Sequence, residues 1–574
     1  MDSEKKKINI KFNVLAIIAI IIFCFAISPK TLQNDTFYTI RIGELIVNNG
    51  IDMQDHFSWH EDLPYTYPHW AYDTGIYLIY HLGEITGLPD GGMLFIYIST
   101  IVFACILGIL IYCINNKLTK NKLVSFVITI AAMYLLKDFI AARAQLVTFI
   151  LFALTILFIE NFLETKKKGY LVGLVLISII IANLHVAVWP FFFVLFMPYI
   201  AEYIIAAIAE KNIIARFMVF NRKDIVKNLE KKLAKETDET KQEVLKQKLE
   251  KAKGNLSLEE QRFEKIKERT IELREKPYKI KVTKNTAVRW LVLVMIICAF
   301  TGLLTPLGDT PYTYLIKTMQ GNTTASISEH LPLTLYNDKE TMAILVLFLM
   351  MLIFTDVKIK LRDLFMLAGL VFLSFMSRRQ VSMLILIGGF VFSKLLTYLV
   401  EKYDAEGCKK FVKFMTTIIG KGCTIAFIIL FSIAIYKPKI DNPYINSASY
   451  PVAAADWMLE NLDVENIRLY NEYNYGSYLL FRGIPVFIDS RADLYAPEFN
   501  GSKNEEGKYE GRDIFSDYIN TSSIGTYYET IMEKYDITHV IVVKKAKLNM
   551  FLSKDDNYTE LYSDNNFIIY ERNI

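Results

Sequence analysis

Long apolar segments, separated by short polar stretches, form the main pattern along the chain. Eleven of them approach the roughly 20 residues that are needed to cross the hydrocarbon core of a membrane. They begin near Phe12, Gly92, Leu123, Leu146, Tyr170, Val188, Val288, Met342, Leu364, Val381 and Phe414. The pattern predicts a polytopic α-helical membrane protein with about eleven transmembrane helices.

Lysine and arginine residues predict how these helices are oriented. Lys5 to Lys7 precede the first segment, and alternate connections are rich in lysine, such as residues 117–122 and 409–413. Cytoplasmic loops are enriched in lysine and arginine, so we expect a cytoplasmic N-terminus. An odd number of spans then places the region after Tyr436 outside the cell, in a multi-pass protein of the plasma membrane. The first segment also resembles a secretory signal, but we expect an uncleaved span.

Two parts of the chain interrupt the apolar pattern. Residues 211–286 are strongly charged with helical spacing, which indicates a cytoplasmic helical hairpin that turns near Gly254 and Asn255. This insertion is either a solvated helical pair or a docking site for a cytoplasmic partner or anionic lipid. The expected parts of the chain are transmembrane residues 1–210, the insertion 211–286, transmembrane residues 287–437 and a C-terminal domain 438–574.

The C-terminal domain has shorter apolar runs that alternate with amphipathic stretches. The predicted strands are Ile467–Tyr470, Val486–Asp489, His539–Val543 and Phe567–Tyr570, and the predicted helices are Val452–Leu462, Tyr527–Tyr535 and Lys545–Leu552. Such alternation is typical of a small α/β domain. By the predicted topology this domain is extracytoplasmic.

Composition narrows the class of protein further. Apolar residues make up 53% of the 574 residues, and the formal net charge is only +4. The high apolar content agrees with a polytopic membrane protein, and the small net charge gives no reason to expect nucleic-acid binding. The six cysteines show no metal-binding spacing and none lies in a large external loop, so we expect no disulfide framework.

The first external loop, residues 30–90, contains the densest group of titratable and aromatic side chains. Asp35 stands at its start, beside the first span, where a carboxylate needs water, a cation or a partner. It is the first catalytic candidate, either as a general base or as a ligand of a divalent cation. The simpler alternative is a capping residue for a helix over Thr36–Val47.

Each further candidate for a site residue in the loops has one functional and one structural interpretation. Asp55 is a second site carboxylate or a turn residue, and His56 belongs to a metal trio with His60 and His69 or makes surface hydrogen bonds. Asp138 and Arg143 form a simple ion pair, or Arg143 binds a phosphate. His185 is part of the site or an interface anchor.

The second half of the chain adds basic and acidic candidates. Glu329 and His330 lie in a long external loop, which is either a lid over a ligand or simply a mobile polar loop. Arg378 and Arg379 lie outside against the positive-inside rule, which favours phosphate binding over contacts with anionic lipid headgroups or a shifted span. Arg491 follows the predicted strand Val486–Asp489, at the strand edge where α/β domains place their sites, or belongs to a local salt-bridge cluster.

Short motifs occur over most of the chain outside the charged insertion. They are NDTFYTIRIGELIVNNG, DHFSW and HW in the first external loop, then ARAQLVTFILFAL, ANLHVAVW, TPLG and NYGSYLLFRGIPVFIDSRADLY. Together they resemble bacterial membrane proteins of the GT-C glycosyltransferase superfamily. The predicted topology is similar to that of the oligosaccharyltransferase catalytic subunit, SISE at Ser326–Glu329 is similar to its TIxE motif, and NYG at Asn474–Gly476 is similar to its WWDYG motif.

The resemblance implies transfer of a sugar from a polyprenyl-phosphate or polyprenyl-diphosphate donor to an extracytoplasmic acceptor. The acceptor is a glycan, a lipid or a protein, which the sequence does not identify. The resemblance gives Asp35 the central acidic role. We expect Arg378, Arg379 and Arg143 to hold the donor phosphate, and the Glu329 loop to close over it.

The cofactor stays open at this point. The candidate is a divalent cation, Mg²⁺ or Mn²⁺, with Asp35, Asp138 and Glu329 as possible ligands. The acidic pairs of the resembled family are incomplete here, because Asn34-Asp35-Thr36 is not D-x-D and Asp138 has no acidic neighbour. This departure weakens the expectation of a metal and of N-glycosylation. Two rival functions are a transporter or flippase of lipid-linked sugars and a non-catalytic membrane scaffold.

Overall fold

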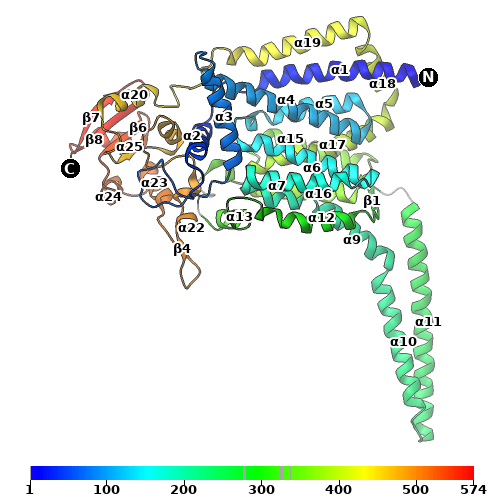
Figure 1. Cartoon of the computed structure of the whole chain (residues 1–574). Coiled ribbons are helices and arrows are strands. Elements are labelled where there is room, and N and C mark those ends of the chain that lie inside the picture. The colour runs from blue at the N-terminus through cyan, green and yellow to red at the C-terminus, as the bar shows by residue number, and fades with distance from the viewer. Residues whose placement is uncertain (1, 276–278, 322, 324–326, 337, 574) are drawn as a thin grey trace.

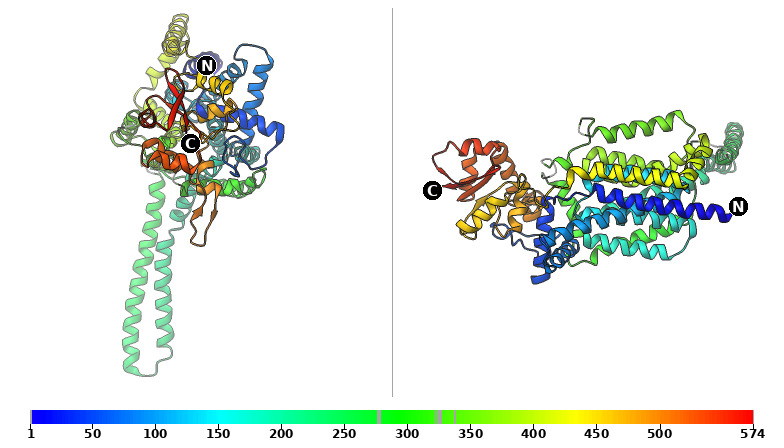
Figure 2. Two further views of the ribbon diagram at one scale, coloured as in Figure 1. Left: turned by 90° about the vertical axis from the view of Figure 1, so that its left-hand side faces the viewer. Right: turned by 90° about the horizontal axis from the view of Figure 1, so that it is seen from above.

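A computed structural model describes residues 2–275, 279–321, 323, 327–336 and 338–573 of the chain. The chain is mostly helical, with a bundle of long helices and a smaller region that contains strands (Figure 1). The strand-containing region lies at one end of the bundle, and the N-terminus lies at the other end (Figures 1 and 2).

The helices of the bundle follow the predicted apolar segments. Its N-terminal half contains α1 Asp2–Ile27, α4 Gly91–Thr119, α5 Lys122–Leu135, α6 Ala144–Thr165, α7 Gly169–Leu184, α8 Trp189–Val194 and α9 Met197–Lys211. Its C-terminal half contains α12 Val288–Ala299, α15 Lys339–Phe354, α16 Leu361–Met376, α17 Val381–Tyr403, α18 Ala405–Met415 and α19 Ile418–Tyr436.

Several of these helices suit a membrane by length and composition. Five stretches of the described chain are long and apolar enough to cross one, namely Gly91–Thr119, Ala144–Thr165, Val186–Ile208, Arg378–Tyr403 and Ile418–Lys439. Four shorter apolar helices accompany them, namely Phe12–Ile27, Lys122–Leu135, Gly169–Leu184 and Val288–Leu303. The chain is thus a multi-pass membrane protein, and the exact count of eleven spans stays a prediction.

The start of the last apolar helix differs from the prediction. The sequence suggested Phe414, but this residue belongs to the amphipathic helix α18, and α19 begins at Ile418. Thr417 separates the two helices, because its hydroxyl accepts a hydrogen bond from the Gly420 N–H and caps the new helix.

Charged side chains inside the bundle are paired with one another. Arg362 and Glu160 lie 2.9 Å apart, and Lys394 lies 3.0 Å from Asp363 and 3.4 Å from Glu160. These four residues come from α6, α16 and α17 and are mostly buried. Pairing is the arrangement expected of ionisable groups at membrane depth.

The charged insertion is a helical hairpin, as predicted. It consists of α10 Ile213–Leu233 and α11 Glu239–Glu275, and it projects as a long arm from the N-terminal end of the bundle (Figure 1). The predicted turn at Gly254 and Asn255 is wrong, because α11 continues through both residues. The chain turns at residues 234–238 instead, where the Asp238 carboxylate accepts the Thr240 N–H at 3.0 Å.

The C-terminal region, described over residues 438–573, is a mixed α/β unit. Its four-stranded sheet has the order β3-β6-β8-β7, with β3 Leu469–Tyr470 parallel to β6 His539–Val543, and β8 Phe567–Arg572 antiparallel to both β6 and β7 Tyr558–Ser563. Its helices are α20 Val452–Asn461, α21 Tyr473–Phe481, α22 Pro497–Asn500, α23 Ile514–Ser523, α24 Tyr528–Lys534 and α25 Lys547–Leu552. Two short pairs complete the strands, with β1 Ile280–Lys281 beside β2 Ile359–Lys360 and β4 Ser502–Lys503 beside β5 Tyr509–Glu510.

One predicted strand of this region is wrong. Residues 486–489 are irregular, and only Val486 forms a β-bridge, with Ser58 of the first loop. The apolar run is buried because it packs under that loop instead of entering the sheet, and the Asp489 and Arg491 positions are therefore not at a strand edge.

Three helices lie at the junction between the bundle and the C-terminal region. They are α2 Asn34–Asn49, α3 Trp70–Ile85 and α13 Thr310–Gln320 (Figure 1). Helices α2 and α3 approach each other so closely at Gly43 that a Cβ atom there would lie 2.1 Å from the Asp73 carbonyl oxygen. This contact packs α2, which carries Asp35 in its first turn, against α3.

Candidate functional site

A cavity of about 360 Å³ lies at this junction. Its size is within the range of about 300–1,000 Å³ that is usual for small-molecule sites. Its lining includes Asp35, Tyr38, His69, Arg143, His185, Tyr314, Glu329, His330, Arg379, Tyr473, Arg491 and Asp493. Residues far apart in the sequence thus share one polar space, and most of the sequence-predicted candidates are among them.

Asp35 and Arg143 form an ion pair in the cavity. Asp35 lies in the first turn of α2, and Arg143 occupies the N-cap position of α6. The two elements are joined by a buried hydrogen bond, in which the Thr36 hydroxyl donates to the Ala142 carbonyl oxygen at 3.3 Å. Both charged side chains keep some solvent access, with exposed fractions of 23% and 28%.

The same guanidinium also contacts Glu329. Arg143 Nη1 lies 3.5 Å from Glu329 Oε1, in the 3₁₀ turn η4 Ser328–His330. The backbone of this turn is fixed by a hydrogen bond that the Ser377 hydroxyl donates to the Glu329 carbonyl oxygen at 3.3 Å. Burial alone would raise the pKa of Glu329, but the positive charges of Arg143 and Arg379 lower it by a larger amount. The net shift of this pKa is downward, and the side chain is ionised.

Arg379 is the second cation of the cavity. It lies in the 3₁₀ turn η5 Arg378–Gln380, directly before α17. Within the described part of the chain, no ion pair or side-chain hydrogen bond occupies its guanidinium, whereas that of Arg143 is bound by two carboxylates. Arg379 therefore remains available for an anion.

Three histidines line the cavity as neutral groups. The rings of His69 and His185 meet edge to face with centroids 4.7 Å apart, and His185 Nδ1 lies 3.0 Å from the Thr148 hydroxyl. Burial lowers the pKa of both His69 and His330, and the positive charge of Arg379 lowers both further. The pKa of His69 falls to about 3. At neutral pH these rings offer hydrogen bonds without adding charge.

Sequence reasoning missed several residues of the cavity wall. Tyr314 of α13 donates its hydroxyl hydrogen to the Asp493 carboxylate, and Asn34 Nδ2 donates to the Tyr473 carbonyl oxygen at 3.0 Å. Asp493 was recognisable only as one of several charged residues in the stretch that contains Asp489 and Arg491. Tyr314 had no signal, because tyrosines are frequent throughout the chain and only the tertiary fold brings this one to the cavity.

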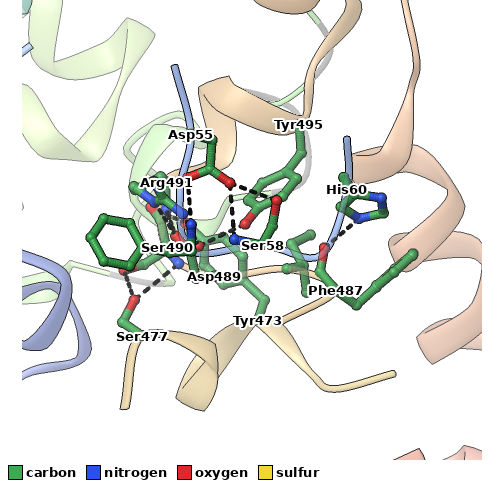
Figure 3. Close-up of polar contacts among 12 residues, drawn as sticks. Asp55, Ser58, His60, Tyr473, Ser477, Phe487, Asp489, Ser490, Arg491 and Tyr495 are labelled. Carbon is green, nitrogen blue, oxygen red and sulfur yellow. Dashed lines mark hydrogen bonds and ion pairs between the residues drawn. The ribbon is translucent and has the colours of Figure 1, made fainter. Parts of the chain in front are cut away.

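A buried ionic cluster, which we call the clasp, adjoins the cavity wall (Figure 3). It consists of Arg491 between Asp55 of the first loop and Asp489, with nitrogen–oxygen distances of 2.5 Å and 2.7 Å. The Tyr495 hydroxyl donates to Asp489 at 2.6 Å, and the Ser58 hydroxyl donates to Asp55 at 2.6 Å. Burial raises the pKa of the Asp55 carboxyl group, but the positive charge of Arg491 and the hydrogen bonds from Ser58 together lower it by more, so the net shift of this pKa is downward.

Further contacts join the first loop to the C-terminal region beside the clasp. The backbone N–H of Trp59 donates to the Val486 carbonyl oxygen at 3.3 Å, and the backbone N–H of Val486 donates to the Phe57 carbonyl oxygen at 3.2 Å. His60 Nε2 lies 2.9 Å from the Phe487 carbonyl oxygen (Figure 3). Burial lowers the pKa of His60 to about 4, so this histidine is a neutral structural group.

Other sequence-predicted residues lie outside the cavity. His56 is exposed on the first loop and pairs with Asp52 at 2.6 Å, so the trio with His60 and His69 is not formed. Asp138 is exposed in the turn η1 Lys137–Phe139, and Arg143 pairs with Asp35 instead of with it. Arg378 donates its backbone N–H to Leu331 at 2.9 Å, and its side chain is not part of the cavity lining.

The proposed metal ligands do not form a metal site. Asp138 is not part of the cavity lining that contains Asp35 and Glu329, and both of these carboxylates are directed at the Arg143 guanidinium. Within the described residues there is no group of three or more His, Cys, Asp or Glu side chains that could hold an ion. Mg²⁺ and Mn²⁺ prefer several oxygen ligands, so this set of donors does not fit either cation. The Ser326 position of the SISE motif lies outside the described residues.

Comparison with known proteins gives a likeness in fold only. No protein-family model matches the chain, and no curated protein sequence matches it. The fold resembles the apo oligosaccharyltransferase of Archaeoglobus fulgidus, with 11% identity and a TM-score of 0.49, over 92% of this chain and 69% of that one. It also resembles that enzyme tethered to an acceptor peptide with the NVT sequon, with 12% identity and a TM-score of 0.49, over 98% and 74% of the two chains.

A third structure has the same degree of similarity. It is the archaeal oligosaccharyltransferase AglB from Archaeoglobus fulgidus in complex with an inhibitory peptide and a dolichol-phosphate, with 12% identity and a TM-score of 0.49, over 97% and 74% of the two chains. The likeness concerns the course of the chain and not the individual residues of the cavity.

Proposed function

We propose that this chain is a membrane glycosyltransferase that moves a sugar from a polyprenyl-phosphate-linked donor to an extracytoplasmic acceptor. One observation carries the proposal. Asp35 shares a polar cavity with two arginines, Arg143 and Arg379, at the end of a bundle of apolar helices. A carboxylate beside two guanidinium groups suits a reaction in which one partner loses a proton and the other leaves as a phosphate.

The position of the cavity suits a lipid-linked substrate. Arg143, His185 and Arg379 lie at the ends of apolar helices, whereas Tyr473 and Asp493 come from the C-terminal region on the other side. A polyprenyl chain in the bilayer can therefore present its phosphate and sugar between the two parts. In the predicted orientation the N-terminus and the hairpin are cytoplasmic, and the cavity opens on the outer side.

The proposed reaction is a displacement at the anomeric carbon of the donor sugar. An acceptor hydroxyl or amide attacks this carbon and gives its proton to the Asp35 carboxylate. The bond between the anomeric carbon and the phosphate oxygen breaks, and its electron pair leaves with the polyprenyl phosphate. Arg379, with support from Arg143, stabilises the negative charge that develops on this oxygen, which is usually the largest catalytic contribution in such reactions.

Transfer by the purified full-length protein in proteoliposomes tests the proposal. The probes are polyprenyl phosphates that carry radiolabelled glucose or mannose, with a cell-envelope fraction as acceptor. We expect label in the acceptor and release of polyprenyl phosphate. Because a general base contributes about 10²–10⁴-fold, Asp35→Asn should reduce transfer by at least about 100-fold while the protein stays folded.

Asp138→Asn is the matched control for this substitution. Asp138 is an exposed carboxylate outside the cavity, so its removal should leave transfer within about twofold of the wild type. Equal transfer by wild type and Asp35→Asn would contradict the proposal. Movement of labelled donor across the bilayer without transfer would instead identify a flippase, and a scaffold would show neither activity.

A further inference from the structure

The guanidinium of Arg143 contacts two carboxylates of the cavity. One of its terminal nitrogens pairs with Asp35, and the other lies 3.5 Å from Glu329. The carboxylates belong to different elements, α2 and the turn η4, which are almost 300 residues apart in the sequence. A single planar cation thus joins two of the three acidic groups that the sequence suggested as ligands of a divalent ion.

The backbone around Arg143 holds this arrangement in place. Arg143 is the N-cap of α6, its N–H donates to the Ala141 carbonyl oxygen at 2.8 Å, and the neighbouring Ala142 carbonyl accepts from Thr36 at 3.3 Å. Arginine remains charged at every physiological pH, and its fork of donors fits carboxylates and phosphates in fixed directions. The position of the charge is therefore determined by the fold and not by a bound ion.

The charges of the cavity can be compared with those of a metal site. Arg143 and Arg379 together carry two positive charges, as one divalent cation would. Arg491 adds nothing to this, because Asp55 and Asp489 neutralise it within the clasp. Asp493 is buried and accepts a hydrogen bond from the Tyr314 hydroxyl, and burial raises the pKa of its carboxyl group.

We infer that Arg143, together with Arg379, takes the place of a divalent cation in this site, and that the site works without a metal. The part of the inference that concerns the donor phosphate rests on the proposed function. The part that concerns cation binding does not, because it follows from the contacts of Arg143 with Asp35 and Glu329. Removal of the guanidinium should expose both carboxylates and create a cation site that the wild type lacks.

Binding of Mn²⁺, followed by electron paramagnetic resonance, tests the inference on the full-length protein in detergent. The wild type should bind no Mn²⁺ in the cavity. Arg143→Ala should gain one Mn²⁺ site, with a dissociation constant on the order of 10⁻⁴–10⁻³ M, as for weak sites with few carboxylates. Adding Asp35→Asn to Arg143→Ala should remove the gained site.

Controls separate this effect from unspecific binding and from misfolding. Arg482→Ala removes an arginine that pairs with Asp456 at 2.7 Å outside the cavity, and it should gain no Mn²⁺ site. Arg143→Gln keeps the size of the side chain and serves if Arg143→Ala does not fold. Mn²⁺ binding by the wild type that Asp35→Asn abolishes would overturn the inference, as would the absence of a gained site in both folded Arg143 variants.

The transfer assay distinguishes failure of this inference from failure of the proposed function. If the wild type transfers sugar, the rate should change by less than about twofold after removal of divalent cations with EDTA. A large loss that Mg²⁺ or Mn²⁺ restores would overturn the inference and leave the glycosyltransferase proposal intact. Conversely, absence of transfer under all conditions would contradict the proposed function, while the Mn²⁺ measurements would still decide the role of Arg143.

Discussion

The clasp between Asp55, Arg491 and Asp489 leads to a sharp prediction about stability. The substitution Arg491→Met keeps an unbranched side chain but removes the guanidinium. The carboxylates of Asp55 and Asp489, whose side chains have an exposed fraction of 0%, would then remain without their cation. Breaking a buried ion pair in this way typically costs about 3–5 kcal/mol, because the remaining charges cannot return to water.

This cost can be measured by thermal unfolding of the full-length protein in detergent. Trp59 lies beside the clasp and donates its indole N–H to the Leu469 carbonyl oxygen at 2.9 Å, so its fluorescence reports on the joint between the first loop and the C-terminal region. In domains of about 150–250 residues the midpoint of thermal unfolding falls by about 2–4 °C per kcal/mol lost. Arg491→Met should therefore lower the midpoint by about 6–20 °C.

The control is Lys508→Met in the same region. Lys508 pairs with Glu506 at 3.7 Å, but both side chains are more than 70% exposed, so the pair contributes only about 0–1 kcal/mol. The double variant Asp55→Asn/Arg491→Met should lose less stability than the sum of its single variants, with a coupling of about 1 kcal/mol or more. If Arg491→Met unfolded at the same temperature as Lys508→Met, the interpretation of the clasp as a structural joint would be refuted.

Two further predictions concern the same junction. Gly43→Ala should destabilise the protein by about 1–3 kcal/mol, because the new Cβ would lie 2.1 Å from the backbone of α3, whereas Gly75→Ala, with open space at its Cβ, should be neutral or stabilising in the same unfolding assay. His60, with a pKa of about 4 in the folded state against about 6.5 in the unfolded state, makes the unfolded state bind more protons between these values. Stability should therefore fall by up to about 3 kcal/mol as the pH drops from about 6.5 to about 4, and His60→Asn should flatten this part of the stability curve; an unchanged curve would contradict the assignment.

The sequence was informative where a local pattern has one structural solution. Apolar runs of membrane length form helices, because only a helix satisfies its own backbone hydrogen bonds in hydrocarbon, and all eleven predicted segments are helical. Charged residues at helical spacing gave the hairpin of α10 and α11. The segments with strong strand composition, such as His539–Val543, also form strands.

The sequence was misleading where an apolar run has more than one way to be buried. The composition of Val486–Asp489 predicts a strand, but the first loop, more than 400 residues earlier in the sequence, buries this segment instead. A contact between residues so far apart leaves no trace in the local hydrophobic pattern. The hairpin turn was misplaced for a related reason, since a single exposed glycine costs a helix only about 1 kcal/mol and does not have to end it.

For the cavity, the sequence determined which kinds of side chain were present, and the tertiary structure decided which of them meet. Asp35, Arg143, Glu329 and Arg379 were recognisable as ionisable groups near the ends of apolar segments, where a charge needs a partner. Their actual partners depend on the contact of α2 with the segment that leads into α6 and on the contact of the turn η4 with the residue before η5. Asp138 and Arg143 are close in sequence yet point to different surroundings, because pairing of charges depends on distance in space, which only the folded chain defines.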